Sequence, residues 1–270
     1  MRILQARVSG HLRAFSSSFM RKYGFTAYTT ETQPAVFFGC YTGRRSNAVS
    51  PDIQAVLRHQ SLAVVIWGGS DAVRITSSRY SSMLHSPRAR HIAISKSISE
   101  DLLRASVPHI CLPVFPSEPS RFTSAPIGSS VYVYSSHTQP VCYNESLVRQ
   151  VIARLPDVKF VRGFSQAPGH YSALQMPSVY AGCFIGLRPT LHDGLPNTVI
   201  ELGLMGRRCI WNGWLPNAIP WTSAGSVVRS IQKEQSKISQ LTKAVLERRA
   251  ERVREYLQLP LGWLDTEFYE

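Results

Sequence analysis

The sequence lacks any long apolar run. Its 270 residues are 44% hydrophobic and 17% charged, yet no stretch approaches the roughly 18 consecutive apolar residues that a membrane-spanning helix needs. An apolar stretch such as residues 61–67 has the length of a buried strand instead. The composition is too apolar for a disordered chain and too mixed for a fibre, so we expect a globular protein with a sizeable core.

Cysteine is scarce and widely spaced. The five cysteines are Cys40, Cys111, Cys142, Cys183 and Cys209. They form no C-x-x-C pair and their number is odd, which argues against a disulfide framework and against a zinc knuckle. We therefore expect a reducing compartment, such as the cytoplasm of a bacterium or of an infected host cell. No His, Cys and Asp cluster has metal-ligand spacing, so we expect no bound metal.

Acidic residues are rare in the first third of the chain. Residues 1–99 hold 13 Lys and Arg but only three Asp and Glu, which gives a net charge of +10. Residues 100–270 hold 17 Lys and Arg and 14 Asp and Glu, which gives +3. This asymmetry predicts a polyanionic partner for the first third: nucleic acid, an anionic membrane surface or a phosphorylated acceptor. The alternative is a solvated basic face that only aids solubility.

The first 25 residues also lack acids. Their arginines and three consecutive serines, Ser16 to Ser18, fit a mitochondrial transit peptide, whereas residues 1–8 followed by Gly10 fit a first strand. We favour the strand. No stretch there has the length of a secretory signal's apolar region.

The rest of the chain alternates short apolar strands with amphipathic helices, which predicts an α/β fold with two parallel sheets. A Pro- and Ser-rich linker, residues 116–129, separates the two series. The predicted strands are residues 1–8, 34–41, 61–67, 90–94, 109–115, 130–134, 158–162, 183–187 and 208–212. The predicted helices are residues 50–59, 99–105, 144–155, 171–181, 196–205 and 232–257. The predicted divisions are residues 1–118, 130–255 and a C-terminal segment, 256–270, that packs back on the body.

Two serines give the starts of helices in the first series. Ser50 is followed by Pro51, which suits the first helical position, so Ser50 is the predicted N-cap of residues 50–59. Ser99 is the predicted N-cap of residues 99–105. In sheets of this kind, ligands bind beyond the carboxyl ends of the strands, and with two facing sheets we expect the site in the cleft between them.

The most informative segment is R-P-T-L-H-D-G-L-P-N-T-V-I-E, residues 188–201. It follows a predicted strand and leads into a helix whose first turn contains Pro196. Asp193 and Glu201 lie on either side of the helix start, where unpaired amides form a ready phosphate site. The acids are expected to bind hydroxyls at opposite ends of one polar ligand. The predicted phosphate-binding amides are those of Gly194, Leu195, Asn197 and Thr198.

The motif D-G-L-P-N-T-V-I-E, followed by L-G-L-M-G-R-R-C-I, resembles the E-G-x-P-x-x-x-x-E…A-x-G-x-P-V motif of the retaining "group 1" (family 4-like) GT-B glycosyltransferases. The resemblance implies two Rossmann-like domains facing across a cleft. It also implies that Asp193 holds hydroxyls of the transferred sugar, that the amides bind the pyrophosphate and that Glu201 holds the ribose. Asp in place of Glu at position 193 shortens that side chain by one methylene group.

The resemblance extends, more weakly, to residues 90–115 and to V-Y-V-Y-S-S, residues 131–136. The family's Arg and Lys for the diphosphate are missing after the latter strand, where Ser135, Ser136 and His137 stand instead. Ser135 is thereby placed at the donor. Arg188 or Arg162 is the candidate for the missing positive charge.

Three further residues are candidates for the site. Gly10 follows the first strand, where the family has a glycine loop near the donor phosphates. His192 precedes Asp193 and is expected to contact phosphate or the acceptor, or else to be a hydrogen-bonded turn residue. Asp71 ends W-G-G-S-D, residues 67–71, and is expected either to bind a sugar or acceptor hydroxyl or to cap the next helix.

The function that the resemblance implies is transfer of a sugar, with retention, from a UDP- or GDP-sugar and without a further cofactor. The absence of a D-x-D motif argues against the metal-dependent transferases of the other major sugar-transfer fold, and no P-loop or G-x-S-x-G motif is present. The favoured acceptor is a hydroxymethylated base in bacteriophage DNA, bound by the basic first domain. Two alternatives remain: synthesis of a lipid-linked or cell-surface glycan, and a non-catalytic nucleic-acid-binding protein on a degenerate transferase fold.

Overall fold

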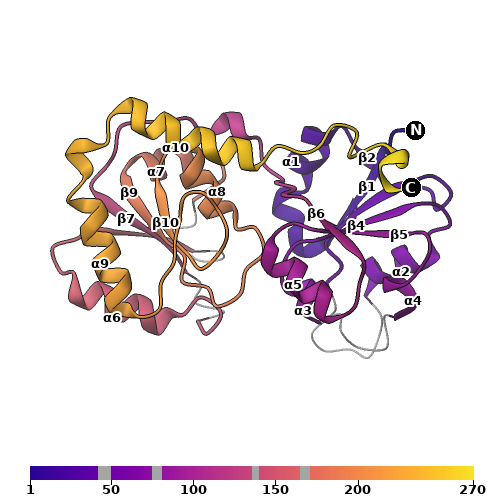
Figure 1. The fold of residues 1–270 in the computed structure, drawn as a ribbon, viewed down its shortest axis with the longest axis horizontal. Coiled ribbons are helices and arrows are strands. Elements are labelled where there is room, and N and C mark those ends of the chain that lie inside the picture. Colours follow the sequence, from indigo (N-terminus) through magenta and orange to yellow (C-terminus); the bar gives the residue numbers. More distant parts are fainter. Residues whose placement is uncertain (42–49, 75–80, 136–139, 165–170) are drawn as a thin grey trace. The chain divides into compact units, whose positions relative to one another are not determined.

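The computed structural model describes residues 1–41, 50–74, 81–135, 140–164 and 171–270 of the chain. Two compact units divide it: unit 1 comprises Met1–Glu118 and Leu257–Glu270, and unit 2 comprises Pro119–Tyr256. Each unit holds a parallel sheet with helices packed against it (Figure 1). The predicted α/β class with two parallel sheets is therefore confirmed.

The sheet of unit 1 has the strand order β2-β1-β3-β4-β5-β6, and every pair in it is parallel. Its central strands β3 and β4 are buried along their whole length, as continuous apolar runs predict for a parallel sheet. The first strand is shorter than predicted because it begins only at Gln5. The strands are β1 (Gln5–Val8), β2 (Thr26–Ala27), β3 (Ala35–Phe38), β4 (Ala63–Trp67), β5 (Ala89–Ala93) and β6 (His109–Cys111).

Serine caps begin two helices of unit 1. Ser50 accepts a hydrogen bond from the amide of Ile53 and is the N-cap of α2, as predicted. The prediction for Ser99 is wrong: Ser95, which follows β5 closely, caps α5 by accepting from the amide of Ile98. The helices are η1 (Gly10–Leu12), α1 (Arg13–Tyr23), α2 (Pro51–Arg58), α3 (Ser70–Arg74), α4 (Ser81–Leu84) and α5 (Lys96–Arg104).

The C-terminal segment packs within unit 1 against the N-terminus. The amide of Ile3 donates to the carbonyl of Leu264 at 2.7 Å. Trp263 lies edge-on to the ring of Tyr23 on α1, with the ring centroids 5.1 Å apart. The chain ends in a short helix, η5 (Thr266–Tyr269). Backbone pairing and an aromatic contact thus fix this segment to the body of unit 1.

The sheet of unit 2 has the strand order β11-β10-β9-β7-β8, again with parallel pairs. Alternate residues of β7 face opposite layers: Val131 and Val133 lie in the core that α6 and α9 cover, whereas Tyr132 contacts Tyr180 on α7. The strands are β7 (Ser130–Ser135), β8 (Phe160–Phe164), β9 (Cys183–Leu187), β10 (Arg208–Ile210) and β11 (Ala218–Ile219). The helices are η3 (Pro119–Arg121), α6 (Glu145–Arg154), α7 (Met176–Ala181), α8 (Asn197–Leu204), α9 (Ala224–Gln235), η4 (Ile238–Gln240) and α10 (Lys243–Tyr256).

The prediction of one long helix over residues 232–257 is wrong. Helix α9 ends at Gln235, a turn of η4 follows, and α10 begins at Lys243. The physical reason is the sheet itself, because α9 packs beside α6 on one face and α10 packs beside α8 on the other (Figure 1). The chain must therefore change direction to cross from one face to the other. Among the described helices, none combines the length and apolarity needed to cross a membrane.

The Pro- and Ser-rich linker is largely packed against unit 2. Phe122 is 1% exposed and lies 6.3 Å from the ring of Tyr180. The carbonyl of Pro126 accepts a hydrogen bond from the guanidinium of Arg207, which is itself fully buried. A segment predicted as a free linker thus contributes contacts to the core of unit 2.

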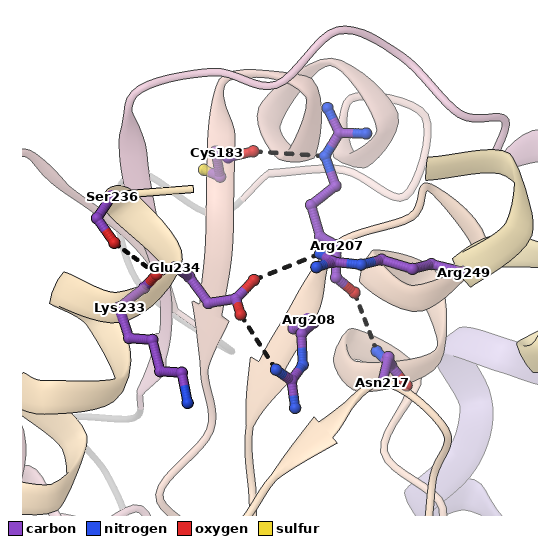
Figure 2. A network of polar contacts seen from close by, with 8 residues as sticks. All are labelled: Cys183, Arg207, Arg208, Asn217, Lys233, Glu234, Ser236 and Arg249. Carbon is purple, nitrogen blue, oxygen red and sulfur yellow. Dashed lines mark hydrogen bonds and ion pairs between the residues drawn. The ribbon is translucent and has the colours of Figure 1, made fainter. Parts of the chain in front are cut away.

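A buried carboxylate ties three elements of unit 2 together (Figure 2). Glu234, near the end of α9, is only 1% exposed. Its Oε1 accepts from Arg208 on β10 at 3.1 Å, and its Oε2 accepts from Arg249 on α10 at 3.3 Å. The pair of arginines compensates for the removal of this carboxylate from water, which would otherwise be costly.

Glu234→Ala is expected to lower the free energy of unfolding by about 2 kcal/mol, because two partly buried guanidinium groups would lose their carboxylate. Urea denaturation followed by circular dichroism measures the change. The matched control is Glu247→Ala on α10, whose ion pair with Lys243 is exposed and should contribute about 0.5 kcal/mol or less. Equal effects of the two substitutions would contradict the role assigned to Glu234.

Candidate functional site

The candidate site lies at the carboxyl edge of the unit 2 sheet. Strand β9 is buried along its length and ends at Leu187. The loop that follows leads into α8, which begins at Asn197. Strand β7 pairs directly with β9, so the residues that end both strands lie at the same edge (Figure 1). This is the edge at which parallel α/β sheets bind ligands.

The start of α8 has no side-chain cap. Its N-cap is Pro196, in an extended conformation, and no side chain bonds to the first turn. Within the described ranges, no acceptor pairs with the amides of Leu195, Asn197 and Thr198. The fourth predicted amide, that of Gly194, instead donates to Oδ1 of Asp193 at 3.1 Å. Three unpaired amides at the positive end of a helix dipole favour an anionic ligand.

Asp193 is held by its own loop. Its Oδ2 accepts from Nε of Arg188 at 2.6 Å and from the hydroxyl of Thr190 at 3.1 Å. Both oxygens are thus engaged, because Oδ1 accepts from the Gly194 amide. The side chain is 18% exposed. Asp193 therefore lies at the predicted place, directly before the amide cluster, with its carboxylate turned toward the loop.

Arg188 is a buried cation at the end of β9. Its side chain is 11% exposed, and its guanidinium lies 4.5 Å from the ring centre of Tyr134 and 5.5 Å from that of Tyr143. Burial disfavours the charged form, but Asp193, Tyr143 and Tyr134 together outweigh this effect and raise the pKa of Arg188. The other candidate cation, Arg162, donates to Glu145 at 2.9 Å and is not part of this group.

Glu201 lies on the second turn of α8 and is 9% exposed. Burial raises the pKa of its carboxyl group to about 7, and the Tyr180 hydroxyl and the charges of Arg121 and Arg188 partly oppose this rise. The Tyr180 hydroxyl donates to Oε2 at 2.8 Å. Arg188 thus acts electrostatically on both acids of the motif.

Two further candidates of unit 2, Ser135 and His192, lie at the same edge. Ser135 ends β7 and is fully buried, and its hydroxyl has no hydrogen-bond partner in the described part of the chain. Ser136 and His137 lie outside the described residues. His192 is exposed and precedes Asp193 in the loop.

Gly10 lies in unit 1, at the carboxyl end of β1, where it begins η1. It is exposed, and a Cβ added there would meet no atom within 4 Å. Packing among the described residues therefore does not require glycine at this position. The prediction that a donor phosphate approaches it stays a prediction.

Asp71 is engaged by the backbone of unit 1, and its predicted contact with a sugar or acceptor hydroxyl stays a prediction. Its side chain is fully buried, and it accepts hydrogen bonds from the amides of Cys40 at 3.3 Å, Gly68 at 3.2 Å and Gly69 at 2.7 Å. Burial raises the pKa of this carboxyl group, and the backbone bonds oppose the rise. Asp71 thus fixes the loop between β4 and α3, and it does so from within the first turn of α3 rather than from the N-cap position that the structural alternative gave it.

Four residues that contact the predicted site residues were not identified from the sequence. These are Thr190 and the aromatic residues Tyr134, Tyr143 and Tyr180. Tyr134 was recognisable as the last residue of a predicted strand, residues 130–134. Tyr143 and Tyr180 carry no local signal, because they meet Arg188 and Glu201 only through tertiary packing. Among the described residues, no group of three or more His, Cys, Asp and Glu is placed to hold a metal ion.

No protein-family model matches the chain, and no curated protein sequence matches it. Solved structures do match. Sucrose-phosphate synthase from Thermosynechococcus elongatus superposes with a TM-score of 0.61 over 92% of this chain and 73% of the synthase, at 13% identity. TarM superposes with a TM-score of 0.55 over 88% of this chain and 54% of its own, at 9% identity. Both neighbours are GT-B glycosyltransferases.

The chain has the GT-B fold. This confirms the fold class that the motif resemblance implies, with a Rossmann-like parallel sheet in each unit. Identity near 10% establishes the fold alone, and the chain spans only about half of the length of TarM. Within the GT-B fold, the carboxyl edge of the unit 2 sheet carries both acids of the recognised motif.

The raised pKa of Glu201 predicts a pH dependence of stability. Between about pH 4.5 and 7 the folded protein retains a proton that the unfolded chain has lost, so stability falls as pH rises through this window. Glutamine does not titrate, so the free energy of unfolding of Glu201→Gln should fall less over this window. The difference between the two proteins is up to roughly 3 kcal/mol. Urea denaturation of both proteins at pH 5 and 8 measures the difference. Parallel pH profiles would contradict the assigned pKa shift.

Proposed function

We propose that this GT-B chain transfers a glycosyl unit from a nucleotide-sugar to an acceptor hydroxyl, with retention of configuration. The observation that carries the proposal is the uncapped start of α8, where three unpaired amides lie between Asp193 and Glu201. Cleavage of a nucleotide-sugar leaves a diphosphate whose negative charge must be stabilised. Preorganised amides at a helix N-terminus supply this stabilisation at no cost of reorganisation.

Glu201 is the proposed ligand of the ribose. Tyr180 occupies its Oε2, whereas Oε1 has no hydrogen-bond partner within the residues that the structure describes. A carboxylate oxygen of this kind accepts hydrogen bonds from vicinal hydroxyls. The exposed His192 is the proposed contact of the transferred sugar or of the acceptor.

UDP is the nucleotide to test first, with GDP second. An S. aureus TarM variant was solved in complex with fondaparinux, alpha-GlcNAc-glycerol and UDP, and it superposes with a TM-score of 0.50 over 88% of this chain and 54% of its own, at 11% identity. This neighbour supports the choice of UDP, whereas the motif resemblance leaves UDP and GDP open.

Release of free nucleotide from a panel of UDP- and GDP-sugars tests the proposal. A transferase slowly hydrolyses its donor when no acceptor is present, because water can replace the acceptor hydroxyl. We expect release from at least one donor. Release from none, together with binding of nucleic acid, would favour the non-catalytic alternative.

Glu201→Ala is expected to weaken binding of UDP or GDP at least tenfold, because the ribose hydroxyls lose their acceptor, which corresponds to about 1.4 kcal/mol. Isothermal titration calorimetry at pH 8, where the carboxyl group is ionised, measures the affinity. Glu247→Ala, on the exposed face of α10, is the control and should bind as the unmodified protein does. If Glu201→Ala binds UDP and GDP as tightly as the unmodified protein does, Glu201 is not the ligand of the ribose.

For the acceptor, we propose a hydroxymethylated base in DNA. Helix α1 is free of acids, and its Arg13 and Arg21 are exposed. Arg88, before β5, is exposed as well. Such cations bind phosphates, and a base must leave the stack to reach a buried site. A DNA-modifying enzyme would act in the bacterial cytoplasm or in an infected host cell. The glycan alternative would direct the same cations toward an anionic membrane surface.

Replacing Arg13 and Arg21 by serine is expected to weaken retention of duplex DNA and to reduce the slope of log affinity against log salt by about 1 to 2. Fluorescence anisotropy between 50 and 200 mM salt measures both quantities. The matched control replaces Lys243 and Arg252, two exposed cations of α10. Tight binding to anionic vesicles without retention of DNA would eliminate the DNA proposal in favour of the glycan alternative.

A further inference from the structure

We propose that Asp193 is a positioning residue for Arg188, and that the terminal Nη groups of Arg188 bind the donor diphosphate. This inference rests on the proposed function, but it changes the role that the motif resemblance implies for Asp193. The resemblance assigns the carboxylate to hydroxyls of the transferred sugar. The contacts in unit 2 assign it to the loop and to its cation.

The first argument is the occupancy of the Asp193 carboxylate. Three donors of its own loop bind it: Nε of Arg188 at 2.6 Å, the hydroxyl of Thr190 at 3.1 Å and the amide of Gly194 at 3.1 Å. These bonds fix both oxygens and the orientation of the group. A carboxylate engaged in this way orients its partners, whereas a sugar ligand needs an oxygen that is free to accept.

The second argument is the terminal donors of Arg188. A guanidinium has five N–H donors in a rigid fork. Within the described residues only Nε has a hydrogen-bond partner, and the four donors on Nη1 and Nη2 are assigned to the ligand. The rings of Tyr134 and Tyr143 restrict the movement of the guanidinium, because both pack against it with their centres 4.5 and 5.5 Å from its carbon atom. A buried fork whose movement is restricted suits two phosphate oxygens at once.

The third argument is placement. Arg188 directly follows β9, and its partner Asp193 lies only four residues before the first residue of α8. The ion pair therefore brings the guanidinium to the loop that carries the unpaired amides. The length of the Asp193 side chain matters, since glutamate would add one methylene group and displace the guanidinium by about 1 Å. The aspartate at position 193 is thus the acid whose length fits the observed position of Arg188.

The test uses inorganic pyrophosphate and UDP or GDP as probes, in calorimetric titrations of the full chain at pH 7.5. Arg188→Met and Asp193→Ala are each expected to weaken pyrophosphate binding at least tenfold. The double variant should bind no more weakly than Arg188→Met, because Asp193 has nothing to position once the guanidinium is gone. Asp193→Glu should also weaken binding, and Arg188→Lys should not restore it, since lysine has no Nε–H.

Two controls separate this inference from misfolding and from the role of Glu201. Arg162→Met removes another partly buried arginine of unit 2, one paired with Glu145, and should leave pyrophosphate affinity unchanged. Circular dichroism and melting temperature report whether each variant folds, and Arg188→Gln replaces Arg188→Met if the latter does not. Glu201→Ala should weaken binding of UDP but not of pyrophosphate.

Two results would overturn the inference while leaving the proposed function in place. In the first, Asp193→Ala leaves pyrophosphate affinity unchanged and lowers only the turnover of the nucleotide-sugar. Asp193 would then bind hydroxyls of the transferred sugar, as the motif resemblance implies. Tighter pyrophosphate binding in Asp193→Ala would show that the acid opposes the phosphate. Failure of the unmodified protein to bind pyrophosphate, UDP and GDP would overturn the inference and the proposed function together.

Discussion

The proposed nucleotide site depends on one unsatisfied helix end. Pro196 begins α8 without a side chain that can accept from the first turn. A serine or aspartate there would pair one of the amides and would stabilise the helix by about 1 kcal/mol. The amides of Leu195, Asn197 and Thr198 instead lack acceptors within the described residues. This arrangement forgoes local stability and leaves a concentrated positive potential for a ligand.

The charged side chains around this helix end interact with one another. The buried cation Arg188 pairs with Asp193 and, together with Arg121, acts on Glu201. The pair keeps the guanidinium charged, whereas the burial of Glu201 brings its pKa to about 7. Glu201 therefore titrates near neutral pH, where small changes in its surroundings alter its charge. A ligand that donates hydrogen bonds to Glu201 would favour the ionised form and lower this pKa.

The sequence predicts the sheets well and tertiary packing poorly. Strands β3 and β4 were recognisable because a doubly covered parallel strand needs a continuous apolar run, and the start of α8 because proline follows a strand and a turn. The division of residues 232–257 into two helices was not, since it depends on which face of the sheet each helix covers. The surroundings of Asp71 were not recognisable for a similar reason: only the fold shows that the amides of Cys40 and two glycines bind its carboxylate. The aromatic neighbours of Arg188 and Glu201 were likewise beyond local patterns.

The most direct test of the central claim is a ¹⁵N–¹H correlation spectrum of the protein titrated with UDP and, separately, with GDP. Amide protons that bind a diphosphate shift strongly, because the phosphate oxygens replace water as their acceptors. The account predicts that the largest shifts occur at Leu195, Asn197 and Thr198. Saturable binding that leaves these three amides unshifted, with the largest changes at the other residues, would contradict it.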